Sequence, residues 1–488
     1  MLKYIVVFLF LTVFSCKVSA QGTFHEAYNE FKKQAEDTYE NFRKKANKEY
    51  ADWMRQAWEW HDRIEPMLMP KDDMMPPVIF DKKKEERKEQ PSPLPYEEVI
   101  PVPEPNPQPK PIAPIREDKG EYEKISFDFF GTNGIVRLPR DFSFKIKGKD
   151  ENAFANAWEE LASGKYDNLI RDCLVLRMEY QLCDWAYLLM LGMMSDKLCG
   201  IGTNESVMLQ GFVFCQSGYK IRFGITKKKE LRVLFKSDHH IFGFEGYKMN
   251  DGIYYVLQPT GEDGLAICDI SYPEEKPLSL WISTEQKFVQ NDSEERLLIP
   301  KGSEQKIRVK TNVNWINFCA TYPTSMIGED IVSRWAMYAN TPLAGNVKEY
   351  LYPQLRAAIN QFENCVTATN WLLYWVQTAF VYEYDDKVWG KDRAFFAEET
   401  LYYPYCDCED RSILFSRLVR DLLGLDVILV FYPGHLATAV DFKIPVNGDY
   451  IELNGKHFTI CDPTYIGAPV GATMPDMDNQ TAKVILLK

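Results

Sequence analysis

The chain lacks an excess of positive charge, has few histidines and shows no disulfide pattern. Its 488 residues contain 57 Lys and Arg against 70 Asp and Glu, which gives a formal net charge of -13. Because nucleic-acid binding depends on basic side chains, this balance argues against nucleic acid as a partner. The 11 cysteines are scattered, mostly in apolar runs, as is typical of buried free thiols. The cysteines and the 6 histidines form no cluster with metal-ligand spacing, so no metal or other cofactor is expected.

Long apolar runs are also missing beyond the first residues. Residues 1–20 hold one early lysine, an apolar run and then Val18-Ser19-Ala20. The run is shorter than the roughly 20 apolar residues of a membrane span. The pattern predicts a signal peptide cleaved after Ala20, and a secreted or periplasmic protein. An alternative interpretation takes Cys16 as a lipidated cysteine that anchors a lipoprotein.

Residues 21–65 are expected to form an amphipathic helix. Three units of eleven residues repeat between residues 24 and 57, and this period keeps the repeated positions on one helical face. Two interpretations remain open: the helix lies on its own protein, or its aromatic stripe serves coiled-coil-like self-association or an envelope partner. The repeated aromatic positions are Tyr28, Tyr39 and Tyr50, and Phe31, Phe42 and Trp53.

Residues 66–118 are rich in proline. Fourteen of the 28 prolines fall between Pro66 and Pro114. Such a composition favours extended, polyproline-like chain, so we expect a semi-rigid spacer between the helix and the globular part.

Residues 119–488 predict an α+β fold, because helical and strand-like patterns alternate in two blocks. We expect an α+β domain at 119–275, a connecting β-rich region at 276–345 and a second α+β domain at 346–488. Helical patterns cover about 152–195 and 346–385. Strand-like patterns lie at 219–224, 231–236, 252–258, 427–432, 436–442 and 457–461.

The most informative segment is YCDCEDRSIL, residues 405–414. Cys408 follows a small turn and opens an apolar-periodic run. A thiol in the first turn of a helix is favoured as a thiolate by free backbone N–H groups and the helix dipole. Further along, His435 begins a strand-like run after a glycine, and Asp462 ends another strand before a proline. Cysteine, histidine and aspartate in this order are the parts of a nucleophilic acyl-transfer site.

Residues 408–430, CEDRSILFSRLVRDLLGLDVILV, resemble the core motif of transglutaminase-like domains, which share the papain-like fold. The DCED sequence is similar to that of the bacterial transglutaminase-like cysteine peptidases. The resemblance covers about 346–488. It implies that Cys408 is the nucleophile, that His435 is the general base and acid, and that Asp462 orients the imidazole. Members of the family hydrolyse peptide or amide bonds or transfer an acyl group from glutamine to an amine, and some are inactive scaffolds.

The leading hypothesis is therefore a cysteine enzyme that acts on the amide bonds of a protein or peptide. Hydrolysis is slightly favoured over acyl transfer, because water is always present. One competing hypothesis is a non-catalytic envelope scaffold or peptide-binding protein with a vestigial site. A weaker one is a redox pair of Cys406 and Cys408, whose spacing departs from Cys-x-x-Cys.

Other residues bear on the charge of the thiol and on the identity of the oxyanion donor and the histidine. Glu409 and Asp410 in the first helical turn oppose the thiolate, and Arg411 offsets them. The backbone N–H of Cys408 is the expected oxyanion donor. Gln377, Trp389 and Tyr403 are weaker side-chain candidates for that role, and His457 is the weaker candidate for the histidine.

The middle of the chain shows a candidate degenerate copy of the same unit. Residues 202–224 run parallel to 408–430 without a gap, residues 240–248 parallel 435–443, and residues 255–260 parallel 459–464. In this alignment Gly202 replaces the nucleophile, His240 matches His435 and Gln258 replaces Asp462. The alternative is an unrelated α+β or β-rich domain.

Overall fold

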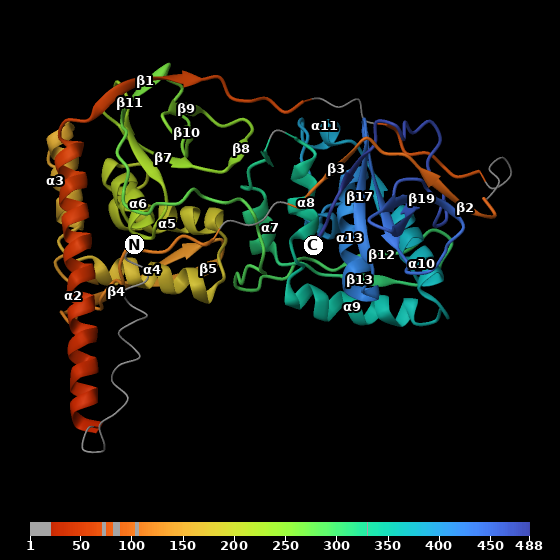
Figure 1. Cartoon of the computed structure of the whole chain (residues 1–488), viewed down its shortest axis with the longest axis horizontal. Coiled ribbons are helices and arrows are strands. Elements are labelled where there is room, and N and C mark those ends of the chain that lie inside the picture. The colour runs from red at the N-terminus through yellow and green to blue at the C-terminus, as the bar shows by residue number, and fades with distance from the viewer. Residues whose placement is uncertain (1–20, 71–74, 82–87, 103–106, 329) are drawn as a thin grey trace.

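The computed structural model describes residues 21–488 except 71–74, 82–87, 103–106 and 329 (Figure 1). The expectation of a mixed α and β fold is confirmed. Residues 1–20 lie outside the described part, and with them the predicted signal peptide and Cys16. Among the described helices, none has the length and apolar character needed to cross a membrane.

The N-terminal helix α2 (Gln21–Met54) packs on the body of the protein toward its C-terminal end. Tyr50 is buried and stacks on Trp158 of α3 (Glu151–Leu161) with ring centroids 4.3 Å apart. Tyr39 and Phe42 in the middle of the helix are about half exposed. The N-terminal end of the helix projects away from the rest of the molecule (Figure 1). The helix therefore lies on its own protein at its C-terminal end and exposes two of the repeated aromatic residues before it.

The first unit combines helices with a closed β-barrel. The barrel order is β1-β11-β6-β7-β10-β9, and β1 (Trp58–Ile64) closes it by pairing with both β11 and β9. The region expected to be helical to residue 65 thus ends as a strand of this barrel. The other elements are β4 (Tyr122–Phe129), β5 (Thr132–Pro139), α4 (Asp167–Glu179), α5 (Asp184–Cys199), α6 (Asn204–Gln216), β6 (Ile221–Ile225), β7 (Leu231–Lys236), β8 (His239–Ile241), β9 (Gly246–Met249), β10 (Gly252–Val256) and β11 (Gly264–Cys268).

The connecting region has short strands and two helices. Its strand β14 (Ser325–Ile327) pairs with β8 and so joins this region to the first unit. The remaining elements are β12 (Arg296–Leu298), β13 (Ile307–Val309), α7 (Val313–Cys319) and α8 (Ser333–Asn340).

The C-terminal unit packs helices on a seven-stranded sheet of order β2-β19-β20-β18-β17-β21-β3. Helix α13 (Cys408–Leu423) lies against β17 and β18. The other elements are α9 (Gly345–Ile359), α10 (Cys365–Ala379), β15 (Val381–Tyr382), α11 (Asp385–Val388), α12 (Ala397–Tyr402), β16 (Tyr405–Cys406), β17 (Asp426–Tyr432), β18 (His435–Asp441), β19 (Gly448–Leu453), β20 (Lys456–Cys461) and β21 (Lys483–Ile485).

The proline-rich segment supplies both outer strands of that sheet. Strand β2 (Pro91–Leu94) runs parallel to β19, and β3 (Glu98–Ile100) runs parallel to β21. We call residues 65–101, which lead from β1 to these strands, the strap (Figure 1). The expectation of a spacer is wrong for β2 and β3, because their main-chain hydrogen bonds make them part of the C-terminal sheet.

The two units share one topology. In each, a helix is followed by five strands of one sheet, and in the first unit β8 is inserted outside this sheet. The order β11-β6-β7-β10-β9 corresponds strand by strand to β21-β17-β18-β20-β19. The pairing register places Tyr255 at the position of Thr459, as the sequence alignment predicts.

The alignment of His240 with His435 is wrong. Residue His240 lies on β8, which pairs with β14 outside the barrel. In the hairpin register, Leu231 corresponds to Leu436 and the exposed Glu230 takes the place of His435.

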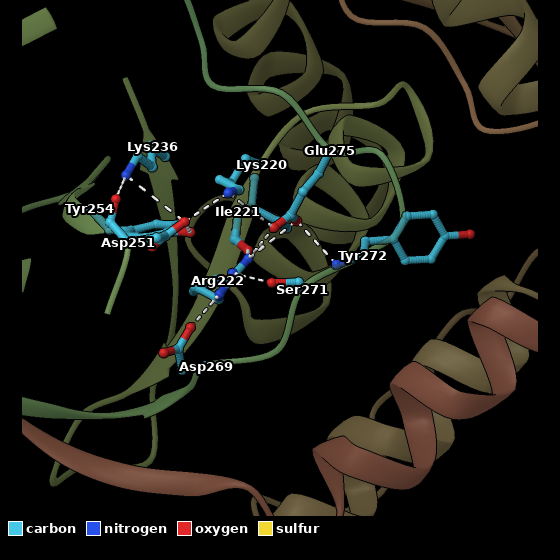
Figure 2. A network of polar contacts seen from close by, with 10 residues as sticks. All are labelled: Lys220, Ile221, Arg222, Lys236, Asp251, Tyr254, Asp269, Ser271, Tyr272 and Glu275. Atoms are coloured by element: carbon cyan, nitrogen blue, oxygen red, sulfur yellow. Dashed lines mark hydrogen bonds and ion pairs between the residues drawn. The ribbon is translucent and has the colours of Figure 1, made fainter. Parts of the chain in front are cut away.

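A buried network of ion pairs links strand β6 to the segment that follows the barrel (Figure 2). Arg222 is 1% exposed and donates through Nε to Asp269 at 2.8 Å and through a terminal nitrogen to Glu275 at 3.1 Å. Lys220 lies 2.7 Å from Asp251 and 3.7 Å from Glu275. The network joins β6 to residues 269–275, which leave the barrel after β11.

We predict that Arg222→Met destabilises the protein. The substitution removes the guanidinium that donates to the buried carboxylate of Glu275 and leaves Lys220 at 3.7 Å beside it. Loss of one partner of a buried ion pair typically costs about 3–5 kcal/mol of unfolding free energy. The midpoint of urea-induced unfolding, followed by circular dichroism, should fall. The control Arg140→Met removes an exposed ion pair with Glu121 and should leave the midpoint nearly unchanged. Equal midpoints in the two variants would contradict the assigned role of the network.

Candidate functional site

Helix α13 places Cys408 at its first residue. Asp407 is the N-cap residue, and its backbone N–H donates to the side chain of Asp410 at 3.2 Å. At the other end Gly424 adopts the left-handed conformation with φ 64°, which ends the helix. The thiol therefore lies at the helix N-terminus, where the sequence predicts it.

His435 and Asp462 come together from neighbouring strands. His435 is the first residue of β18, and Asp462 directly follows β20, which pairs with β18. The Nε2 atom of His435 lies 2.8 Å from Oδ2 of Asp462. Nδ1 of His435 is buried and has no hydrogen-bond partner among the described residues. With its hydrogen on Nε2, the imidazole keeps a free lone pair on Nδ1.

The loop after Asp462 holds the carboxylate in place. Its Oδ1 atom accepts hydrogen bonds from the backbone N–H groups of Thr464 at 2.8 Å and Tyr465 at 3.2 Å. Gln377 donates to the main-chain oxygens of Asp462 at 2.9 Å and Ala468 at 3.1 Å. Because both amide hydrogens of Gln377 are used in this way, its side chain positions the loop and has no hydrogen left for an oxyanion.

The thiol of Cys408 donates to a carboxylate in this structure. Its Sγ atom lies 3.1 Å from Oε2 of Glu409. The backbone N–H of Leu436, next to His435, also points to the sulfur and lowers the thiol pKa slightly. The thiol thus lies against the start of β18, while Nδ1 of His435 remains free of a hydrogen bond.

The electrostatic environment disfavours the thiolate. Burial raises the pKa of Cys408 well above its ordinary value, and the carboxylates of Glu409 and then Asp407 raise it further. The expected benefit of the helix N-terminus is therefore outweighed. The guanidinium of Arg411, which is expected to offset these acids, donates to the main-chain oxygens of Gln377 and Phe380.

Acidic side chains gather around Cys408 in a group that the spacing of residues in the sequence does not predict. Asp407, Cys408 and Glu409 bring one ligand atom each within 4.8 Å of one another, and Asp385, Asp392 and Glu409 do the same. Both carboxylate oxygens of Asp407 are buried, and burial and then Glu409 raise the pKa of this carboxyl well above its ordinary value. Burial and then Glu409 raise the pKa of Asp385 to about 8. Such an oxygen-rich set could hold a divalent cation, although the sequence indicates no metal.

One further side chain near the thiol is missed by sequence reasoning. The hydroxyl of Tyr382 on β15 is buried and has no hydrogen-bond partner among the described residues. Burial raises its pKa, and the next largest contribution comes from Cys408. A negative charge on the sulfur would therefore interact with this hydroxyl. No local pattern in the sequence predicts that Tyr382 lies near Cys408.

The remaining candidates lie away from the pair. Cys406 lies on β16 and points its thiol toward the main-chain oxygen of Val381 at 3.8 Å. His457 stacks on Tyr450 at 4.3 Å on the far end of β20.

Trp389 and Tyr403 pack against each other edge to face, and the guanidinium of Arg393 lies 4.6 and 5.2 Å from the centroids of their rings. No interaction in the described structure links them to Cys408.

No family model, no curated protein and no solved structure matches the chain.

We predict that Cys408 holds its proton at neutral pH. In a buffer with a metal chelator, the thiolate absorbance lost in Cys408→Ser should develop only well into the alkaline range. In Glu409→Gln the same signal should develop at lower pH, because a nearby negative charge is removed. Glu363→Gln, an exposed surface change, is the control. A thiolate signal already complete at neutral pH in the wild type would refute the assignment.

Proposed function

We propose that the C-terminal unit is a transglutaminase-like cysteine enzyme of the papain-like type that acts on peptide or amide bonds. The observation that carries the proposal is the hydrogen bond between His435 and Asp462, in which Nδ1 of the imidazole stays unpartnered among the described residues. Cys408 lies at a helix N-terminus, and the backbone N–H of Leu436, the residue after His435, points to its sulfur. A nucleophile, a base and a residue that orients the base are the minimum of a nucleophilic amide-bond enzyme.

The reaction begins when Nδ1 of His435 accepts the proton of the Cys408 thiol. The thiolate bonds to the carbonyl carbon, and the carbonyl oxygen becomes an oxyanion. Backbone N–H groups at the start of α13 donate to this oxyanion. When the C–N bond breaks, His435 gives the proton to the leaving amine. Water then cleaves the thioester, or an amine does so in acyl transfer.

Two groups assist this chemistry. Asp462 accepts from Nε2 of His435 and stabilises the imidazolium that forms. The unpartnered hydroxyl of Tyr382 is a candidate second donor to the oxyanion. Hydrolysis stays slightly favoured over acyl transfer, since nothing on the chain marks an amine site.

The proposal includes a setting outside the cytoplasm. The signal-like residues 1–20 support secretion or a periplasmic location, with a protein or peptide as substrate. The exposed Tyr39 and Phe42 on the projecting part of α2 support self-association or docking onto an envelope partner.

The alternative is a non-catalytic envelope scaffold or peptide-binding protein. Two observations favour it: the three site residues are buried, and the pKa of the Cys408 thiol is raised. A scaffold would bind peptides equally well after any change at Cys408.

The test is turnover of a mixed peptide library, read by mass spectrometry, with and without an added primary amine. Cys408→Ser should abolish new peptide termini, and His435→Ala should slow their formation by about 100-fold or more. Asp462→Asn should slow it as well.

The matched controls are Cys406→Ser and His457→Ala, which change the same residue types away from the pair. Turnover that survives Cys408→Ser would refute the proposal. Turnover absent from every form of the protein, with the strap intact or cut, would favour the scaffold.

A further inference from the structure

The three site residues are closed off from solvent. Cys408 is 1% exposed, and His435 and Asp462 are each 2% exposed. A polypeptide substrate therefore needs some part of the chain to move before it reaches the sulfur.

The strap lies beside the site and is held by its main chain. The backbone N–H of Met75 donates to the oxygen of Gly434, the residue before His435, at 3.0 Å. The N–H of Ile466 donates to Val78 at 2.8 Å, and the N–H of Phe80 donates to Ile466 at 3.0 Å. Residue Ile79 thus forms a parallel bridge with Ile466. An extended segment paired in this way is bound as a peptide is bound at a strand edge.

Side chains of the strap pack on a small apolar cluster of the same loop. The ring of Phe80 meets that of Tyr465 edge to face at 5.4 Å. Tyr465 is the residue whose N–H donates to Asp462, so the strap packs on the loop that holds this carboxylate. The cluster contains the buried Tyr465, Ala468 and Met474, with Met75, Val78 and Phe80 packed against it.

The strap also touches the opposite flank of the site. The sulfur of Met69 lies 3.5 Å from a guanidinium nitrogen of Arg334. Arg334 forms an ion pair with Asp392 at 2.9 Å, and Asp392 belongs to the carboxylate group that includes Glu409. Contacts of the strap therefore reach both the histidine side and the cysteine side.

We propose that the groove along Gly434 and Ile466 is the substrate groove of this site and that strap residues 75–80 occupy it in the intact chain. This surface offers main-chain hydrogen bonds and an apolar cluster that includes Tyr465, so the substrate class is an extended polypeptide with apolar side chains. The enzyme is then latent until the strap leaves. This inference rests on the proposed function for its catalytic meaning, but the occupancy of the groove is measurable without turnover.

The strap can be released without touching the sheet. Residues 71–74 and 82–87 flank the segment that occupies the groove, and β2 begins only at Pro91. In the test, both flanks are replaced by the recognition sequence of one specific protease in the full chain. Cutting both frees residues 75–81 as a peptide, which loses the high effective concentration of a tethered segment.

The readout is alkylation of Cys408 by iodoacetamide, measured by peptide mass spectrometry with Cys365 as the internal reference. Double cutting should speed alkylation by about tenfold or more, because tethering alone typically contributes at least this factor. Adding the peptide MPPVIF in trans should slow it again, and MPPVIA should protect less. In the uncut chain Phe80→Ala should speed alkylation, while Ile79→Ala, which changes a side chain 76% exposed, should not.

The outcomes separate the two proposals. Faster alkylation without any peptide turnover supports the occupied groove and overturns the proposed enzyme. Unchanged alkylation after double cutting overturns the occupied groove, whatever the turnover. Circular dichroism and thermal melting of the cut chain show whether the fold is retained. A cut chain that unfolds overturns the claim that the strap is separable. In that case the alkylation rate of Cys408 in the uncut Phe80→Ala variant tests whether the strap occupies the groove.

Discussion

Main-chain pairing of the strap with both edges of the C-terminal sheet is the constraint on which the rest of the structure depends. Strand β2 contributes Pro91 and Pro93, which have no N–H to donate. Proline suits an edge strand for this reason, and it stops further pairing at that edge. Because β1 of the same chain closes the barrel, the two units are held to one another by a segment that belongs to both.

The acidic surroundings of Cys408 set a second constraint. A buried thiol hydrogen bonded to Glu409 and close to Asp407 is a poor nucleophile, since the thiolate would be a further negative charge in the same small volume. The helix N-terminus supplies too little positive potential to reverse this. Chemistry at this sulfur therefore requires a change of charge as well as access. Protons on the carboxylates or a bound cation would each provide that change.

Local sequence patterns predicted the elements that carry the site, for identifiable reasons. The apolar period after Cys408 and the glycine at 424 mark both ends of α13, and the pattern at 231–236 coincides with β7. These elements are fixed by their own periodicity and by turn residues. The sequence also predicted that His435 and Asp462 lie close together. They do, because His435 begins β18 and Asp462 directly follows β20, which pairs with β18.

The parts that sequence reasoning missed depend on contacts between distant residues. The strands β2 and β3 lie in a composition that favours a spacer, and only pairing with β19 and β21 makes them strands. Asp385 and Asp392 join Glu409 through folding of the segment between α10 and α12, which no spacing rule reveals. The misplacement of His240 has the same origin, since its strand departs from the barrel to pair with β14.

The shared topology explains why one segment can both hold the fold and cover the site. The first unit closes its five common strands into a barrel with β1, while the second leaves them open and covers the edges with β2 and β3. In the first unit the corresponding positions hold Gly202, Glu230 and Gln258, so the cysteine, the histidine and the aspartate are all absent from it. Residues 91–100 pair with the sheet, whereas residues 75–80 contact Gly434 and the loop that follows Asp462. Different residues of the strap therefore pair with the sheet and contact the surroundings of His435 and Asp462. Substitutions in residues 75–80 could change the second set of contacts while the pairing of β2 and β3 is kept.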